Sequence, residues 1–125
     1  MKRSPLRKRS KRPIARLKAE ADRVFSIWIR KRDDNVCYTC GNRFEMLQAG
    51  HFISRTRSAT RFDEMNVHAQ CVGCNVWKRG NVGLYSLRLI RDYGQKKFRE
   101  LLETGEKIHQ FTEKELEAII EKYTP

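Results

Sequence analysis

Four cysteines, arranged as two C-x2-C pairs, constrain this 125-residue chain more than any other feature of its sequence. The pairs are Cys37/Cys40 and Cys71/Cys74, with 30 residues between them. Two thiolates at this spacing converge on one cation, and two such knuckles complete a tetrahedral site closed to water, which is typical of structural zinc. The alternatives are two disulfides, which a cytosolic compartment disfavours, and a redox C-x-x-C, which needs no second copy. The spacing therefore predicts a structural zinc ion held by all four cysteines.

The length and composition allow one domain with a modest core. Hydrophobic residues make up 39% of the chain, and a domain of this size buries roughly two-thirds of its unfolded surface. No apolar stretch is long enough to span a membrane, and no apolar signal segment follows the basic N-terminus. We therefore expect a soluble, cytoplasmic protein without a membrane partner, in which zinc compensates for the small core.

The positive charge of the chain is concentrated at its N-terminal end. The net charge is +12, and residues 1–32 carry 13 basic side chains against two acidic ones. The composition of the first residues predicts a disordered basic arm over 1–13. Such an arm either aids solubility or binds phosphates through counterion release, and it lacks the apolar face of a membrane-binding segment. The candidate DNA contacts in the arm are Lys2, Arg3, Arg7, Lys8, Arg9, Lys11 and Arg12.

Hydrophobic spacing predicts a single α+β domain over residues 14–125. Its finger core covers about 36–80, and helices about 84–123 follow. Thr112 and Glu115 form a capping box that predicts the start of the last helix. The other expected elements are a helix from Ile14 to about Asp33, strands over 47–54 and 66–71, a helix opened by Asn75, and helices over 84–93 and 95–103.

One histidine and two asparagines stand at particular distances from the cysteines. His51 follows Gly50, Asn66 lies five residues before Cys71, and Asn75 directly follows the last cysteine. This order resembles the HNH branch of the His-Me finger nucleases, in which a β-hairpin and a helix carry a His, a middle Asn and a final His or Asn. The resemblance implies a zinc-knuckled ββα, treble-clef-like core with His51, Asn66 and Asn75 as catalytic residues.

A closer resemblance covers roughly residues 1–100. The runs AGHFISR and TRFDEMNVHAQCVGCN, together with the basic SPLRKRS leader, are similar to the lambda-type phage Rap (NinG) recombination endonucleases. That family implies metal-dependent cutting of branched DNA, including Holliday junctions, in the cytoplasm of a bacterial host, with phage recombination proteins as possible partners. Symmetric cutting of a four-way junction takes two active sites, so a homodimer is expected. Its contacts or the core would use Leu84, Leu87, Leu89 and Ile90.

The chemistry of phosphodiester hydrolysis also follows from the residues. His51 is largely neutral at physiological pH and is a candidate general base, although a packed structural role is the alternative. Asn75 offers a hard oxygen ligand for Mg2+ or Mn2+, and it also suits a helix cap. Gly50 stands where many HNH enzymes place a metal ligand. Either Asn75 acts with water and phosphate oxygens, or Asp63 or Glu64, otherwise turn residues, completes the metal shell.

Basic and aromatic residues near this site are candidates for DNA contact. Arg55, Arg57 and Arg61 lie in the predicted hairpin loop, where arginine pairs well with phosphate. Lys78 and Arg79 fall one turn into the predicted helix, either facing phosphate or forming a solvated face. Trp28 lies on the apolar stripe of the first helix and is expected in the core. Trp77 is left between packing and stacking on unpaired bases.

The remaining histidines are expected to be unremarkable, and rival functions stay open. His68 is expected to pack structurally or face solvent, and His109 to be an ordinary loop residue. No segment shows a base-reading helix, so recognition by charge and shape is expected. The alternatives are an HNH nickase acting on ordinary duplex DNA and a non-catalytic zinc-stapled DNA-binding accessory protein. An RNA nuclease is disfavoured because RNA-specific stacking motifs are absent.

Overall fold

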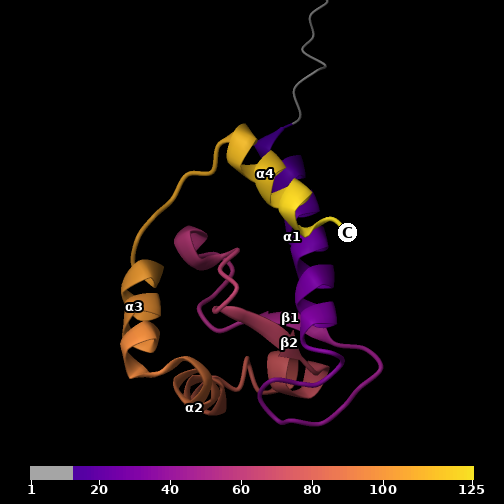
Figure 1. The fold of residues 1–125 in the computed structure, drawn as a ribbon, viewed down its shortest axis with the longest axis vertical. Helices are drawn as coiled ribbons and strands as arrows, with labels where there is room; N and C mark the ends of the chain where they lie inside the picture. Colours follow the sequence, from indigo (N-terminus) through magenta and orange to yellow (C-terminus); the bar gives the residue numbers. More distant parts are fainter. Residues whose placement is uncertain (1–12) are drawn as a thin grey trace, which may run out of the picture.

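The computed structural model describes residues 13–125, so the predicted basic arm, apart from Pro13, lies outside the described residues. Helices surround a small antiparallel sheet, which is the α+β architecture that the sequence predicts (Figure 1). In chain order the elements are α1 (Ile14–Arg32), β1 (Gln48–His51), η1 (Ser58–Thr60), β2 (Val67–Gln70), η2 (Gly73–Trp77), α2 (Val82–Tyr93), α3 (Gln95–Gly105) and α4 (Glu113–Tyr123).

Helix α1 forms where the apolar stripe predicts it. Its first turn is closed by the Pro13 carbonyl, which accepts hydrogen bonds from the backbone N–H groups of Arg16 and Leu17. Three basic residues in the last turn complement the negative end of the helix dipole. The helix ends at Asp33, and Asp34 and Asn35 then adopt left-handed backbone angles. The buried residues of the helix are Leu17, Ala21, Val24, Phe25 and Ile29.

The two strands are confirmed but are shorter than predicted. They pair antiparallel, with Gly50 opposite His68 and His51 opposite Val67. Beyond His51 the chain leaves the sheet, because the side chain of Asn66 bonds both backbone groups of Ile53. Every residue of β2 is buried, since α1 and the cysteine knuckles cover it. The sheet is therefore the centre on which the other elements are placed.

Helix α4 lies along α1 and closes one side of the molecule (Figure 1). It begins with the predicted capping box, in which Glu115 N–H donates to Thr112 Oγ1 at 3.1 Å and Thr112 N–H donates to Glu115 Oε1 at 2.9 Å. At its far end Tyr123 packs edge-on against Phe25, with 4.8 Å between ring centroids. Trp28, which is expected in the core, packs on the same tyrosine but is only half-buried, at the edge of that cluster.

Helices α2 and α3 are joined at Gly94, whose φ of 91° permits the sharp bend. Helix α2 begins at Val82, two residues earlier than predicted. Of the apolar residues assigned to a dimer or to the core, Leu89 is fully buried, Leu84 and Ile90 are half-buried, and Leu87 is 62% exposed. None of the described helices is both long and apolar enough to cross a membrane.

Candidate functional site

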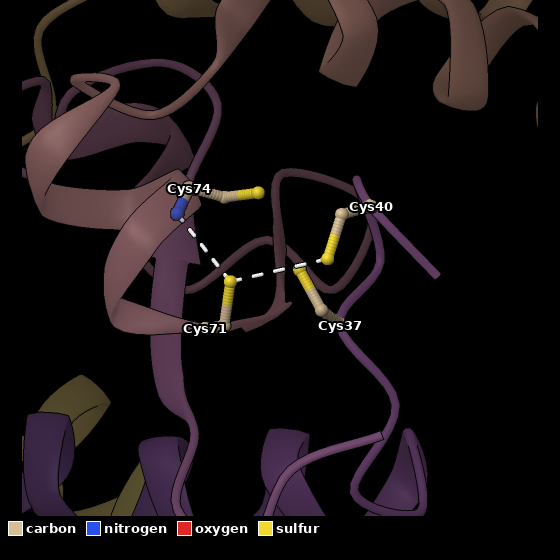
Figure 2. Close-up of side chains that lie close together, drawn as sticks. All are labelled: Cys37, Cys40, Cys71 and Cys74. Atoms are coloured by element: carbon tan, nitrogen blue, oxygen red, sulfur yellow. Dashed lines mark hydrogen bonds between the residues drawn. The ribbon is translucent and has the colours of Figure 1, made fainter. Parts of the chain in front are cut away.

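The four cysteines converge from two knuckles, with Cys37 and Cys40 facing Cys71 and Cys74 (Figure 2). Gly41 closes the first knuckle with a φ of 79°, and its N–H donates to the carbonyl of Cys37. The backbone N–H of Tyr38 donates to Ala69 of β2, which ties this knuckle to the sheet. All four Sγ atoms lie within 4.8 Å of one another, and all four cysteines are free thiols.

This cluster has the chemistry and spacing of a zinc site. A tetrahedral Zn–S distance of about 2.3 Å requires sulfur atoms roughly 3.8 Å apart, and the Sγ atoms of Cys40 and Cys71 lie 3.9 Å apart. Burial raises the pKa of Cys71 to about 12. Burial also acts to raise the pKa of Cys37, but hydrogen bonds from Thr39 and from backbone N–H groups lower it to about 6. The predicted four-cysteine centre could hold a zinc ion, and binding would release protons.

His51 ends strand β1 and is held by a backbone carbonyl. Its Nε2 lies 2.9 Å from the carbonyl oxygen of Arg61. A carbonyl only accepts, so Nε2 carries the hydrogen, and Nδ1 therefore carries the lone pair. Burial lowers the pKa of His51 below its ordinary value, against the opposing effect of this hydrogen bond. The ring is thus a neutral imidazole of defined tautomer at neutral pH.

Asn66, which directly precedes β2, is fully buried and organises the loop that follows His51. Its Oδ1 accepts from the N–H of Ile53 at 2.8 Å, and its Nδ2 donates to the carbonyls of Ile53 at 3.0 Å and Thr60 at 3.1 Å. The predicted contact between Asn66 and the histidine-bearing segment is therefore present in the geometry.

Asn75 lies in the middle of η2, not at the start of a helix as predicted. Its N–H donates to the carbonyl of Cys71, so the turn already begins within the second knuckle. The side-chain Nδ2 donates to Gln48 Oε1 at 2.7 Å, across to β1. This contact links η2 to the first residue of β1.

An open cavity of about 480 Å³ joins His51 and Asn75. One wall is α1, another is β1, and the start of the loop after β1 contributes Ser54 and Arg55. Arg30 on α1 bonds Ser26 through its Nε, which fixes the side chain along the helix. The lining residues are Asp22, Phe25, Ser26, Arg30, Leu47, Gln48, Ala49, His51, Ser54, Arg55 and Asn75.

The carboxylates proposed to complete a metal shell lie elsewhere. Glu64 Oε2 accepts from the hydroxyl of Tyr123 at 2.7 Å, and Asp63 caps its own turn by accepting from the N–H of Met65. Neither lines the cavity. The carboxylate that does is Asp22, which the sequence analysis missed because α1 reads as an ordinary amphipathic helix. Arg30 and Gln48 were also missed, because their place in the cavity depends on how α1 packs against the sheet.

The predicted phosphate-binding residues fall into different environments. Arg55 lines the cavity, and Arg57 is exposed. Arg61 instead pairs with Asp22, so its guanidinium is engaged within the protein. Lys78 and Arg79 are exposed but follow η2, and Arg79 has a φ of 50°, so they do not stand at a helix N-terminus. The predicted contacts Lys2 to Arg12 lie outside the described residues.

Gly50 has no room for a side chain, which explains the residue found before His51. A Cβ at this position would lie 1.8 Å from Oε1 and 2.6 Å from Cδ of Gln70. Gln70 is itself fixed, because its Nε2 donates to the carbonyl of Gly80 at 2.9 Å and to Thr39 Oγ1 at 3.2 Å. Any side chain before His51, that of a metal ligand included, would therefore clash with Gln70 as it is held here.

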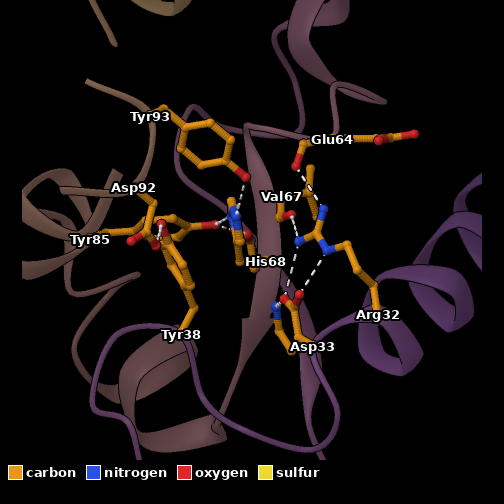
Figure 3. Close-up of polar contacts among 11 residues, drawn as sticks. Arg32, Asp33, Tyr38, Glu64, Val67, His68, Tyr85, Asp92 and Tyr93 are labelled. Atoms are coloured by element: carbon orange, nitrogen blue, oxygen red, sulfur yellow. Dashed lines mark hydrogen bonds and ion pairs between the residues drawn. The ribbon is translucent and has the colours of Figure 1, made fainter. Parts of the chain in front are cut away.

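His68 belongs to a buried polar network and not to the cavity (Figure 3). Its Nδ1 lies 3.3 Å from the Tyr85 hydroxyl, and its Nε2 lies 3.1 Å from the Tyr93 hydroxyl. The ring stacks on Tyr38, with 3.8 Å between centroids. The Tyr85 hydroxyl donates to the carbonyl of Gly50 at 2.7 Å, so this network braces the residue before His51. The prediction of a structural role for His68 is confirmed.

The remaining residues singled out from the sequence lie at the surface. His109 pairs with Glu115 at 2.9 Å, at the start of α4. Its ring does not line the cavity that contains His51. Trp77 is 80% exposed, which answers the open question about its packing. An exposed indole has no role in the core, so it is free for contact with another molecule.

Fold and site together define a small α+β protein with a four-cysteine centre and a cavity bearing a histidine, an asparagine and arginines. A family model described as the bacteriophage lambda NinG protein matches residues 2–125. Over 123 residues, 94% of this chain, the identity is 37% to Protein ninG of Escherichia phage 933W, 37% to that of Salmonella phage P22 and 36% to that of Escherichia phage lambda. The chain belongs to the bacteriophage NinG family.

This membership covers nearly the whole chain but not the whole of its relatives. The chain spans about 60% of the length of the relative from phage 933W and 59% of those from P22 and lambda. No solved structure matches the chain.

Proposed function

We propose that this chain is a metal-dependent endonuclease of the HNH, His-Me finger type that hydrolyses phosphodiesters in branched DNA. Such DNA includes Holliday junctions and related recombination intermediates. The observation that carries the proposal is the shared cavity, in which His51 and Asn75 lie together with Arg30 and Arg55. The order of β1, β2 and η2 around the cysteine knuckles also supports the ββα resemblance. Membership of a phage family agrees with a role in phage recombination.

His51 supplies the proton acceptor in the proposed reaction. Its Nδ1 takes a proton from the attacking water, and its lowered pKa keeps that nitrogen unprotonated at neutral pH. The hydrogen bond from Nε2 to the Arg61 carbonyl stabilises the imidazolium that forms. Asn66 keeps the loop that carries this carbonyl in place through its bond to Thr60. Arg30 and Arg55 neutralise the phosphate in the cavity.

The donor set of the cavity fits a hydrated hard cation. Asn75 offers its Oδ1, because its Nδ2 is already bonded to Gln48. Asp22 is paired with Arg61, so the protein offers few ligands and a bound Mg2+ or Mn2+ would keep most of its waters. When bound, such a cation supplies charge stabilisation at the leaving oxygen. The zinc ion expected at the four cysteines has a structural role.

Surface features support branched DNA as the substrate. Trp77 is exposed and is followed by Lys78 and Arg79, so an indole and two cations lie next to each other along the chain. Aromatic side chains stack on exposed base faces, which the open centre of a junction offers and a continuous duplex does not. Symmetric cutting takes two active sites, so we expect a homodimer, and the exposed Leu87 is a candidate contact.

The test compares cleavage of a labelled four-way junction with that of a linear duplex of matched sequence, in Mg2+, Mn2+ or EDTA. We expect junction-selective, metal-dependent cleavage that His51→Ala lowers by about 10²- to 10⁴-fold. The matched control is His109→Ala, which removes a histidine outside the cavity. Asn75→Ala should also lower cleavage strongly, whereas Gln48→Ala breaks the same hydrogen bond but keeps the candidate metal ligand and should cost less.

Three outcomes would contradict the proposal. Equal cleavage of junction and duplex would make the protein an HNH nickase. Tight binding without cleavage in any metal would make it a zinc-stapled DNA-binding accessory protein. Full activity of His51→Ala would remove the histidine from the mechanism.

A further inference from the structure

Asp22 and Arg61 form a nearly buried ion pair beside His51. Arg61 Nε lies 3.0 Å from Asp22 Oδ1, and a terminal nitrogen of Arg61 lies 2.5 Å from Oδ2. The exposed fractions of the two side chains are 20% and 18%. The remaining terminal nitrogen donates to the carbonyl of Arg55 at 3.2 Å. Two-point contact between a guanidinium and a carboxylate is directional, so this pair fixes where the Arg61 residue lies relative to α1.

The main chain of Arg61 contacts the ring of His51. Its carbonyl accepts the Nε2–H of His51 at 2.9 Å. The preceding carbonyl, of Thr60, is held separately by Asn66 Nδ2 at 3.1 Å. The loop is therefore anchored at two successive residues, one tied to β2 and the other tied to α1.

We infer that Asp22 is a positioning residue, which acts through Arg61 to hold the carbonyl that keeps His51 in its Nε2–H tautomer. In that tautomer the Nδ1 lone pair is available to accept a proton. The inference rests on the proposed role of His51 as the base. It assigns Arg61 to this internal contact and not to the binding of DNA.

A metal-ligand role is the competing account of a carboxylate in this cavity. Both oxygens of Asp22 are within hydrogen-bond distance of Arg61 nitrogens, and Arg55 brings a second guanidinium to 3.9 Å from Oδ2. A divalent cation at Asp22 would face two positive groups at close range. The charges around Asp22 therefore favour positioning over ligation.

The direct test is the tautomer of His51 in the zinc-loaded full chain, measured by long-range ¹H–¹⁵N correlation of the three histidine side chains. His51→Gln assigns the signal. We expect a single Nε2–H tautomer in the wild type and a mixture of tautomers in Asp22→Ala and in Arg61→Gln. The exchanged pair Asp22→Arg/Arg61→Asp should restore the wild-type spectrum. Asp34→Asn removes the same charge from a residue that does not line the cavity and is the matched control.

Cleavage kinetics provide the second measurement. Asp22→Ala should lower kcat on the junction by about 10²-fold, the cost of a displacement of roughly 1 Å. The Mg2+ concentration for half-maximal rate should not change. The double variant Asp22→Ala/Arg61→Gln should be no slower than either single variant, because both break one contact. Asp22→Asn, which keeps the side-chain volume, is used if Asp22→Ala does not retain zinc.

An unchanged His51 tautomer in Asp22→Ala would overturn the inference. A raised Mg2+ requirement with the tautomer preserved would make Asp22 a metal ligand. The spectra do not depend on cleavage. A wild type that does not cut DNA would therefore contradict the proposed function, while the tautomer of His51 in Asp22→Ala would still test the positioning role of Asp22.

Discussion

His51 and His68 lie on paired strands, yet their rings meet different surroundings. The ring of His51 borders the open cavity, with one nitrogen bonded to a carbonyl and the other holding a lone pair. The ring of His68 is 3% exposed and lies between the hydroxyls of Tyr85 and Tyr93. Burial, aided by the charge of Arg32, lowers the pKa of His68 to about 4. One histidine is thus suited to proton transfer, and the other stabilises the fold in its neutral form.

The buried His68 should make the protein less stable in mild acid. In the unfolded chain a histidine takes up a proton near pH 6.5, but in the folded protein His68 does so only near pH 4. The stabilisation is therefore fully present above pH 6.5 and is lost as the pH falls from 6.5 towards 4. Between pH 7 and pH 5 this loss is about 2 kcal/mol in the free energy of unfolding.

Urea unfolding at both pH values, with zinc present, measures this loss. His68→Phe keeps an aromatic ring against Tyr38 and should show a flatter pH dependence, although it is less stable at pH 7 because two hydroxyl contacts are removed. Asp33 and Asp92 also act on His68, so the difference between wild type and variant is the quantity to compare. Identical pH dependence in both proteins would show that another group titrates.

At this scale the sequence predicts only some of the site. The cysteine spacing and the positions of His51, Asn66 and Asn75 follow from the order of these residues along the chain, with His51 and Asn66 between the two knuckles and Asn75 directly after the second. Asp22 could not be found in this way. It is 39 residues from Arg61, and its place in the cavity depends on how α1 packs against the sheet.

The segment η2 shows why element boundaries are harder to predict than element types. The pattern after Cys74 suggests a helix that begins at Asn75, but the backbone turns within the second knuckle instead. Lys78 N–H donates to Gly73 at 2.9 Å, and Gly80 N–H donates to both Cys74 and Asn75. The wide turn carries the chain around the sulfur atoms, and a regular helix starts only at Val82. The backbone of this segment is therefore set by bringing the cysteines of the two knuckles together and not by the helix propensity of the residues after Cys74.

The tip of η2 should contribute to DNA binding and not to stability. Trp77→Ala removes a side chain that is 80% exposed, so the free energy of unfolding should change by less than about 0.5 kcal/mol. Loss of stacking on a base face exposed at the branch point should weaken junction binding by about 1–3 kcal/mol. Fluorescence anisotropy with labelled junction and duplex measures the effect, with the half-exposed neighbour Val76→Ala as control. Equal weakening for both DNAs would argue against base stacking.

Within residues 13–125 the buried apolar residues form several small clusters, some of which share neighbouring side chains. One cluster contains Phe25 and Tyr123 and joins α1 to α4, and a second contains Tyr85 and Leu89 of α2. A third contains the four cysteines together with Leu47 and Ala69. None of these clusters is extensive, so a cation at the cysteines should hold the molecule together.

Removal of zinc should therefore unfold much of the protein. Structural zinc contributes on the order of 10 kcal/mol in small domains, which is comparable with the whole stability of a domain, roughly 5–15 kcal/mol. We expect a strong chelator, or Cys40→Ser, to lower Tm sharply in circular dichroism. Added Zn2+ should restore the chelated wild type, whereas Mg2+ should not. An unchanged Tm in metal-free protein would show that the packed clusters suffice.

The concentration of charge before Pro13 should determine how DNA affinity depends on salt. Residues 2–12 contain seven Lys or Arg, and each neutralised phosphate contributes about 0.9 to the slope of log K against log salt. A variant lacking residues 1–12 should lose up to about six from that slope and keep its junction selectivity. Anisotropy titrations at several NaCl concentrations measure it. An equal slope in both proteins would place the phosphate contacts on the folded domain.

The close approach of Gly50 and Gln70 couples the side chains that these two positions can carry. An acidic residue before His51 would collide with the Gln70 side chain, and a shorter residue at 70 would first leave the Gly80 carbonyl and the Thr39 hydroxyl without their donor. Either change alone lowers the stability of the fold, whereas an acidic residue at 50 combined with a shorter residue at 70 avoids the clash. A ligand-bearing side chain before His51 therefore requires a compensating change at position 70.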